Sequence, residues 1–324
     1  MRPYEEYLSY INSEIEKRPF TGNPNNLYEP LNYILTLGGK RMRPVLTLMG
    51  CELFGGAMDT ALKQALGIEV FHNFTLMHDD IMDVAPLRRG KPTVHVKWNE
   101  PTAILAGDLM LIKAIDLVRD ADISLQKPLL DIFNQTAIEV CEGQQQDMDF
   151  EGRENVTEAE YIEMIRLKTA VLLGCALQTG AMMANATPEG AKNIYRFGEL
   201  VGIGFQLMDD VLDVFGDNEK VGKQAGGDII SNKKTYLLIK ALELAEGETK
   251  QQLTHWINVS DFIPAEKVTA VTAIYNTLGI KELATQKSES YFTEAYNLLE
   301  TIDMPAENKK YLHDFCEWIR TRVS

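Results

Sequence analysis

The sequence is poor in cysteine, the residue that forms disulfides and many structural metal sites. Only four cysteines occur among 324 residues, Cys51, Cys141, Cys175 and Cys316, and they lie far apart without a paired motif. We therefore expect reduced, mostly buried thiols in a cytoplasmic protein, with neither a disulfide framework nor a cysteine metal site.

Long apolar runs and period-two patterns are also missing. The longest apolar stretch, residues 171–186, contains Gln178 and Thr179 and is too short to cross a bilayer. The first residues lack the basic and then apolar pattern of a signal peptide. Sustained alternation of apolar and polar residues is absent, and no hairpin signal occurs. These absences predict an all-α protein with no membrane span.

Positive charge is scarce. Lysine and arginine number 32 against 47 acidic residues, which gives a net charge of −15. This balance argues against nucleic acid or an anionic membrane surface as a partner. An anionic substrate must therefore be attracted by local clusters of cations or by metal ions.

Proline and glycine divide the rest of the chain into helical segments. The apolar pattern predicts helices over residues 4–17, 27–37, 44–55, 58–83, 125–150 and 157–184, and further helices beginning near Pro101, Pro188, Pro264 and Pro305. Thr157 and Glu160 form a capping box at the start of one of them. No low-complexity linker interrupts the chain, so we expect one domain over residues 1–324.

Two acidic trios stand out on these helices. Each has two adjacent aspartates and a third aspartate three residues after the second, and they are Asp79, Asp80, Asp83 and Asp209, Asp210, Asp213. On a helix each trio falls within about 100° of arc, where like charges repel. A hard divalent cation with oxygen ligands would neutralise them. We expect a polymetal site that binds a diphosphate between two facing helices.

Cations cluster where phosphate binding needs them. Residues 38–44 place Lys40, Arg41 and Arg43 in a glycine-flanked turn before a helix, and helix N-termini favour anions. A second cluster, residues 88–91, follows the first trio. Three further lysines are single cations, each of which alone is more often a surface residue: Lys168, Lys223 and Lys233.

Taken together, these motifs resemble the trans-isoprenyl diphosphate synthase, or polyprenyl synthetase, family, and in particular its short-chain farnesyl and geranylgeranyl members. The motifs occur in the family's order at residues 38–44, 79–83 with 88–90, 107–108, 143–147, 168–169 and 205–213. The resemblance implies an isoprenoid-synthase-type helical bundle around a central cavity. It also implies a homodimer and three Mg²⁺ ions bound with the substrate.

The resemblance further implies a reaction in which isopentenyl diphosphate is condensed with an allylic diphosphate, dimethylallyl or geranyl. Asp79, Asp83 and Asp209 would bind Mg²⁺, with Asp80, Asp210 and Asp213 nearby. The allylic diphosphate would be held by Arg88, Lys168, Lys223 and Lys233. The isopentenyl diphosphate would be held without metal by Lys40, Arg43, His72 and Arg89. The developing cation would be stabilised by Thr169, Gln206 and the ring of Phe205.

Helix geometry bears on the product. Two glycines below the second trio, Gly198 and Gly202, leave either a groove for a growing hydrocarbon or a surface for close helix packing. In the family, the residue five places before the first trio often limits chain length, and here it is Phe74, with Phe71 one turn further on. A bulky floor predicts a C15 product first and C20 second. Ideal geometry turns Phe74 away from the carboxylates, so simple packing is the alternative.

Three other functions compete with prenyl transfer. The pair His78-Asp79 is found in metal phosphohydrolases, but these need further histidines and the sequence has five in all. A class I terpene cyclase shares the first trio but usually lacks a complete second one. A non-catalytic subunit of a hetero-oligomeric synthase tends to lose the acidic motifs. Both complete trios favour a catalytic prenyltransferase.

Overall fold

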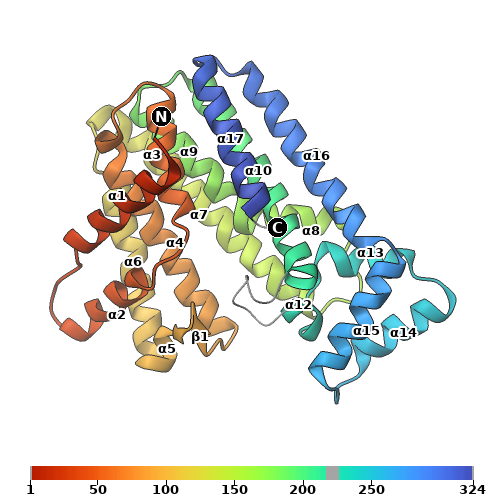
Figure 1. The fold of residues 1–324 in the computed structure, drawn as a ribbon. Coiled ribbons are helices and arrows are strands. Elements are labelled where there is room, and N and C mark those ends of the chain that lie inside the picture. The colour runs from red at the N-terminus through yellow and green to blue at the C-terminus, as the bar shows by residue number, and fades with distance from the viewer. Residues whose placement is uncertain (1, 217–225, 323–324) are drawn as a thin grey trace. The chain divides into compact units, whose positions relative to one another are not determined.

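The computed structural model describes residues 2–216 and 226–322, and these are almost entirely helical (Figure 1). Lys223, a predicted ligand of the allylic diphosphate, lies outside the described residues. The first half of the chain forms α1 (Tyr4–Lys17), α2 (Asn25–Thr36), α3 (Met42–Leu53), η1 (Met58–Ala61), α4 (Leu62–Met82), β1 (Leu87–Arg88), β2 (Lys91–Pro92), α5 (Val94–Lys97), α6 (Glu100–Val118) and α7 (Ile123–Glu151).

The second half continues in the same way. It forms α8 (Glu158–Ile165), the π-helical turn η2 (Arg166–Ala170), α9 (Val171–Met183), α10 (Pro188–Phe215), α12 (Gly227–Ile230), α13 (Tyr236–Leu244), α14 (Gly247–Asn258), α15 (Pro264–Thr277), α16 (Ile280–Thr301) and α17 (Ala306–Arg322). The prediction of an all-α fold is confirmed.

Most predicted helices lie within a few residues of the observed ones. The capping box is present, since the Thr157 hydroxyl accepts from the Glu160 amide and the Glu160 carboxylate accepts from the Thr157 amide. The expectation that no hairpin occurs is wrong in one place. Strands β1 and β2 pair antiparallel around Arg89 and Gly90, both at positive φ. Two residues per strand are too few to give an alternating pattern.

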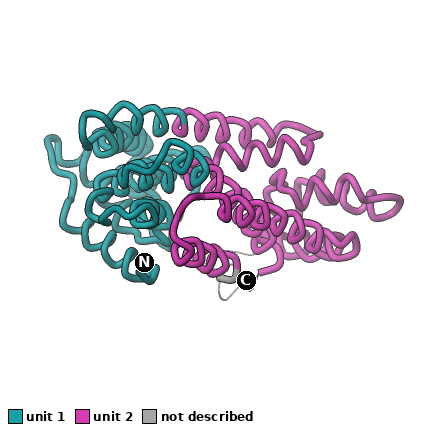
Figure 2. The backbone as a smooth tube through the Cα atoms, turned by 90° about the horizontal axis from the view of Figure 1, so that it is seen from above, with its two compact units in different colours: residues 1–135, 175–195 teal, residues 136–174, 196–324 magenta. Residues whose placement is uncertain are grey.

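The chain divides into two compact units, each built from two segments (Figure 2). Unit 1 comprises residues 1–135 and 175–195, and unit 2 comprises residues 136–174 and 196–324. Helices α7, α9 and α10 each contribute residues to both units. This division does not test the expected single domain, which stays a prediction.

Each unit has its own buried core. In unit 1, α4 packs along α6 and against α3 (Figure 1), and it buries side chains on most of its faces. In unit 2, buried residues of α8, α10, α13 and α15 form one cluster, for example Tyr161, Leu207, Leu237 and Ile274. These two cores hold the helices that carry the acidic trios.

Two predictions from composition can be compared with the structure. Cys51, Cys175 and Cys316 are buried, Cys141 is exposed, and all four are free, as expected. No helix in the described part of the chain is long and apolar enough to span a membrane.

Candidate functional site

The first acidic trio ends α4 in unit 1. Asp80 is buried and accepts two hydrogen bonds from the Arg88 guanidinium, both of 2.8 Å. Hairpin β1–β2 carries Arg88 to this carboxylate. Arg88 pairs with Asp80 in the structure, and its predicted role in holding the allylic diphosphate stays a prediction. Asp79 and Asp83 lie one turn apart at the more exposed end of the helix.

A cluster of cations also lies in unit 1. An Arg43 guanidinium nitrogen lies 3.2 Å from His72 Nε2, and Arg89 donates to the carbonyl of Gly38, two residues before Lys40. Burial and the charge of Arg43 hold the pKa of His72 well below its ordinary value, so His72 is neutral and accepts from Arg43. The Nε of Arg43 is enclosed and has no hydrogen-bond partner in the part of the chain that the structure describes. An enclosed, unpaired donor among cations suits an oxyanion.

A buried ion pair lies beneath this cluster. Arg41, at positive φ, pairs with Glu69, and both side chains are 2 % exposed. Glu69 also accepts a 2.9 Å hydrogen bond from Asn73. The Arg41–Glu69 ion pair therefore stabilises the turn that carries Lys40 and Arg43. Because Arg41 is buried in this pair, it is not one of the cations that could contact a diphosphate.

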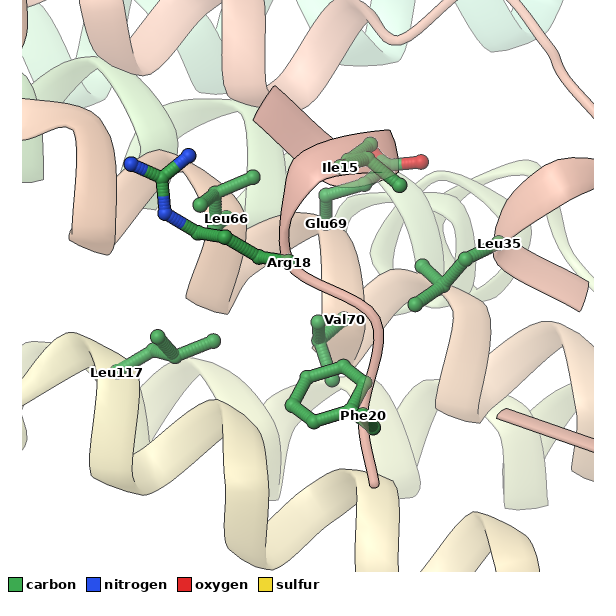
Figure 3. A pocket seen from close by; sticks show the side chains of 8 residues that line it. All are labelled: Ile15, Arg18, Phe20, Leu35, Leu66, Glu69, Val70 and Leu117. Atoms are coloured by element: carbon green, nitrogen blue, oxygen red, sulfur yellow. The ribbon is translucent and has the colours of Figure 1, made fainter. Parts of the chain in front are cut away.

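Glu69 also lines a small pocket (Figure 3). The cavity has a volume of about 70 Å³, and most of its walls are apolar side chains: Ile15, Phe20, Leu35, Leu66, Val70 and Leu117. Arg18 completes the lining. The pocket leaves space beside the Glu69 carboxylate, which is otherwise enclosed by protein.

The second trio lies near the end of α10 in unit 2. Asp210 is buried and accepts hydrogen bonds from the Tyr161 hydroxyl and from the Gln206 amide. Burial and the neighbouring Asp228 raise the pKa of Asp210 to about 8. Asp213 accepts a 3.0 Å hydrogen bond from the Asp228 amide, whereas Asp209 is exposed.

Asp210→Asn is expected to flatten the dependence of stability on pH in the metal-free protein. The unfolded carboxyl releases its proton near pH 4 and the folded one near pH 8, so wild-type stability from this group falls as pH rises through that window. Denaturant unfolding in EDTA at pH 5 and pH 9 measures this. Asp209→Asn, which removes an exposed neighbour, should keep the wild-type slope. If the stability of Asp210→Asn depended on pH as steeply as that of the wild type, the raised pKa of Asp210 would be contradicted.

Lys168 and Lys233 share one carboxylate in unit 2. Lys168 Nζ lies 2.6 Å and Lys233 Nζ 3.5 Å from Asp147 Oδ2. Burial alone would raise the pKa of Asp147, but the two lysines together lower it below its ordinary value. Asp147 therefore holds two of the predicted diphosphate ligands side by side.

The neighbouring residue Thr169 belongs to a polar chain. Its hydroxyl lies 3.2 Å from the Gln206 carbonyl oxygen, and the Gln206 amide donates to Asp210. The structure thus brings together Thr169, Gln206 and Asp210 of the second trio, and their predicted role at the developing cation stays a prediction. Phe205 lies on α10 beside Gln206 and is half-buried.

The glycines below the second trio serve close packing. A Cβ at Gly202 would lie 2.6 Å from the Ala170 Cα, and one at Gly198 would lie 2.9 Å from the Gly174 Cα. Backbone of η2 and α9 fills the space that the groove hypothesis assigned to a hydrocarbon. The groove alternative is therefore wrong at these two positions, and the packing alternative holds.

Aromatic rings follow one face of α4. The Phe71 ring lies 5.6 Å from Phe74 and 5.1 Å from Phe133, and the Phe74 ring lies 4.8 Å from His78. His78 in turn contacts α6, where a Cβ at Gly107 would lie 2.2 Å from its Nε2. Phe74 thus points along a different face from Asp79 and Asp83, as ideal helix geometry predicts.

Comparison with known proteins decides the family. The model of the polyprenyl synthetase family matches residues 24–278. The chain belongs to the polyprenyl synthetase family. It is accordingly a trans-prenyltransferase, a prenyl diphosphate synthase, as the motifs predicted.

Relatives within the polyprenyl synthetase family cover most of the chain. A geranylgeranyl diphosphate synthase of Methanosarcina mazei is 42 % identical over 237 residues, 72 % of this chain and 73 % of the relative. One of Sulfolobus acidocaldarius is 37 % identical over 322 residues, 96 % of each chain. These names contradict the farnesyl prediction, which relied on the bulk of Phe74 although ideal helix geometry turns that side chain away from the carboxylates.

Solved structures of the family agree with the fold. A crystal structure of a geranylgeranyl pyrophosphate synthase has a TM-score of 0.96 and 44 % identity, with all of both chains covered. A Caulobacter crescentus polyprenyl synthase, complexed with calcium and isoprenyl diphosphate, has a TM-score of 0.87 and 26 % identity, covering 99 % of this chain and 96 % of that one.

The donor set of this polyprenyl synthetase fits Mg²⁺ without a preformed cage. Among residues 2–216 and 226–322, no three His, Cys, Asp or Glu side chains are close enough to enclose an ion. Mg²⁺ is typically bound through one or two carboxylates, several waters and substrate phosphates. Asp79 with Asp83 in unit 1, and Asp209 in unit 2, offer such partial sets.

Sequence reasoning missed three residues of these sites. Asp147 was part of a recognised motif but had no assigned role, and Glu69 and Tyr161 were not singled out. An acidic residue inside an otherwise apolar helix, as Glu69 is, signals a buried partner. Nothing in the sequence indicated that Tyr161 would bond to Asp210, because the two are 49 residues apart.

Proposed function

We propose that this polyprenyl synthetase makes geranylgeranyl diphosphate, a C20 product, by adding isopentenyl diphosphate to allylic diphosphates with Mg²⁺. The observation that carries the proposal is the cation cluster around Arg43, whose Nε is enclosed and has no hydrogen-bond partner among the residues that the structure describes. A terpene cyclase binds one diphosphate and has no need of a second, metal-free anion site. The C20 product is supported by the names of the relatives.

The residues of each unit would then have separate tasks. In unit 1, Lys40, Arg43, neutral His72 and Arg89 would bind the isopentenyl diphosphate by charge and hydrogen bonds. In unit 2, Asp147 would hold Lys168 and Lys233 for the allylic diphosphate. Arg88 would act through Asp80, which it neutralises and orients.

Metal ions fit the remaining carboxylates. Asp79, Asp83 and Asp209 would hold three Mg²⁺ ions, which when bound neutralise the charge that develops on the departing pyrophosphate. Asp210 accepts a hydrogen bond from Tyr161, and Asp213 accepts one from the Asp228 amide. These two aspartates would therefore orient the metal ligand Asp209 and would not bind the ions themselves. Thr169 and Gln206 would place a hydroxyl and an amide dipole beside the developing cation.

The proposal is tested by product analysis. Purified protein is incubated with labelled isopentenyl diphosphate, Mg²⁺ and dimethylallyl, geranyl or farnesyl diphosphate, and products are sized by chromatography. A main C20 product from every primer is expected. Cyclised hydrocarbon would indicate a terpene cyclase, and no chain extension would indicate a non-catalytic subunit.

Substitutions should separate the two diphosphate sites. Arg43→Ala should raise KM for isopentenyl diphosphate, and Lys168→Ala should raise KM for the allylic substrate. Loss of a charged hydrogen-bond partner costs about 1.5–3 kcal/mol, or roughly ten- to a hundredfold in affinity. Initial rates with each substrate varied in turn measure this. An effect of Arg43→Ala on the allylic KM alone would show that the sites are assigned wrongly.

Phe74 is proposed to limit product length together with Phe71. Phe74 lies about 7.5 Å along the α4 axis from Asp79, and its ring is supported by Phe71 and His78. Phe74→Ala, alone and with Phe71→Ala, should shift products beyond C20 with turnover largely kept. Phe292→Ala removes a buried ring elsewhere and serves as the control. An unchanged product length in the folded double variant would remove Phe74 as the determinant.

We also propose a homodimer. Ile104, Leu105 and Ile112 of α6 are 40–60 % exposed, which is unusual for large apolar side chains gathered on one helix. Light scattering in solution, with Leu105→Lys as the variant expected to weaken association, tests this. A monomeric wild type would contradict it.

A further inference from the structure

One arginine outside the proposed diphosphate sites pairs with carboxylates from three helices of unit 2. Arg166 donates two 2.8 Å hydrogen bonds to Glu163 of α8 and one of 2.8 Å to Glu199 of α10. It also lies 3.8 Å from Glu139 of α7. The hydrogen bonds to Glu163 and Glu199 raise the pKa of Arg166 above its ordinary value despite burial.

Arg166 is the first residue of the π-helical turn η2. The same turn carries Lys168 and Thr169. A π turn is wider than a regular helical turn and is seldom formed without support from its surroundings. Its position therefore depends on the elements that contact it.

Helices α7 and α10 each present a matching row of three residues to this turn. On α7 the row is Glu139, Gly143 and Asp147, at four-residue spacing, and on α10 it is Glu199, Gly202 and Gln206, at spacings of three and four. Residues at these spacings share a helix face. In each row an acidic residue pairs with Arg166, a glycine meets the turn backbone, and a polar residue bonds to the turn's side chains.

The glycines set the distance between turn and helices. A Cβ at Gly143 would lie 2.3 Å from the Lys168 amide nitrogen, and one at Gly202 would lie 2.6 Å from the Ala170 Cα. Close backbone approach limits movement towards α7 and α10 but cannot stop the turn from sliding or lifting away. The ion pairs of Arg166 supply that missing restraint.

We propose that Arg166 is a positioning residue that fixes the π turn on α7 and α10, so that Lys168 reaches Asp147 and Thr169 reaches Gln206. The proposal rests on the proposed function, because Lys168 and Thr169 are its allylic-site residues. The planar guanidinium suits this task, since it addresses several carboxylates in fixed directions, which an ammonium group cannot do.

The test compares Arg166→Gln with Arg196→Gln. Arg196 also pairs with Glu199, and with Glu294, but it lies on α10 and outside the turn, so it is a matched control. Arg166→Gln should lower kcat about a hundredfold, as small misplacements of reacting groups do, and raise the allylic KM. The isopentenyl KM should stay at the wild-type value, and Arg166→Lys should recover part of the loss. Arg196→Gln should keep wild-type kinetics.

A double-variant cycle shows whether Arg166 acts through Lys168. In a Lys168→Ala background, Arg166→Gln should cause no further rise in the allylic KM. Additive effects would overturn the proposal, as would a lower melting temperature of Arg166→Gln with unchanged kinetics. If Arg166→Gln does not fold, Glu139→Gln serves in its place, because it removes the 3.8 Å ion pair between Glu139 and Arg166. Glu139→Gln should raise the allylic KM as well. Unchanged kinetics of this variant would overturn the proposal. The prenyl-transfer rates of the wild type and of Arg196→Gln test the proposed function itself, because neither protein alters Arg166.

Discussion

Replacing Asp79 or Asp209 by Asn is expected to lower kcat about a thousandfold or more, because metal ions contribute several kcal/mol to stabilising developing charge. Asn keeps the size of the side chain and removes the negative charge that binds the cation. Asp79 is half-buried near the end of α4, and Asp209 is the exposed member of the second trio. Steady-state rates with saturating Mg²⁺ and both substrates measure the effect.

The control for these two variants is Asp116→Asn. Asp116 lies on α6 and forms an exposed pair with Arg119, so its loss should leave kcat unchanged. EDTA should abolish wild-type activity and Mg²⁺ should restore it. Near-normal turnover of either trio variant, or full activity in the chelator, would refute the metal-dependent mechanism.

Glu69→Ala should destabilise the protein by about 3–5 kcal/mol, because it leaves the buried Arg41 charge without its carboxylate partner. Both side chains are 2 % exposed, so the Arg41 guanidinium lies out of contact with bulk water. The truncated side chain also enlarges the adjoining cavity of about 70 Å³, which adds to the loss. Urea unfolding of the wild type and the variant gives the difference in free energy of unfolding.

Two comparisons isolate the buried charge as the cause. Asp120→Asn breaks an ion pair with Lys63 in which both side chains are 57 % exposed, and should cost about 1 kcal/mol or less. Arg41→Met with Glu69→Leu removes both charges and should be more stable than Glu69→Ala alone. A loss in Glu69→Ala no larger than that in Asp120→Asn would contradict the explanation.

Local features of the fold were predictable because their signals lie close together in the chain. Helix α1 was predicted with its observed bounds, since its apolar period is clear and Pro3 precedes it. The capping box and the helix starts at Pro188 and Pro264 follow from single residues with a strong local effect. Short helices such as α12 and α13 were not predicted, because four to nine residues carry too little pattern.

Partners distant in the sequence could not be predicted. Both trios were recognised from spacing, but the spacing does not reveal that Arg88 neutralises Asp80 or that Tyr161 bonds to Asp210. Gly202 was assigned two equally good roles, and only the position of the Ala170 backbone decided between them. The product length was predicted wrongly because the bulk of Phe74 was given more weight than its direction, which ideal helix geometry already indicated.

Because each compact unit is built from two separate segments, the protein is not easily divided into fragments that fold alone. Each compact unit combines an N-terminal segment with one that returns later in the sequence, and the borders at residues 135 and 174 fall inside α7 and α9. No single cut therefore releases either unit as one continuous polypeptide. Truncated forms would expose apolar helix faces that need the missing segment, so split versions should regain structure only when both pieces are expressed together.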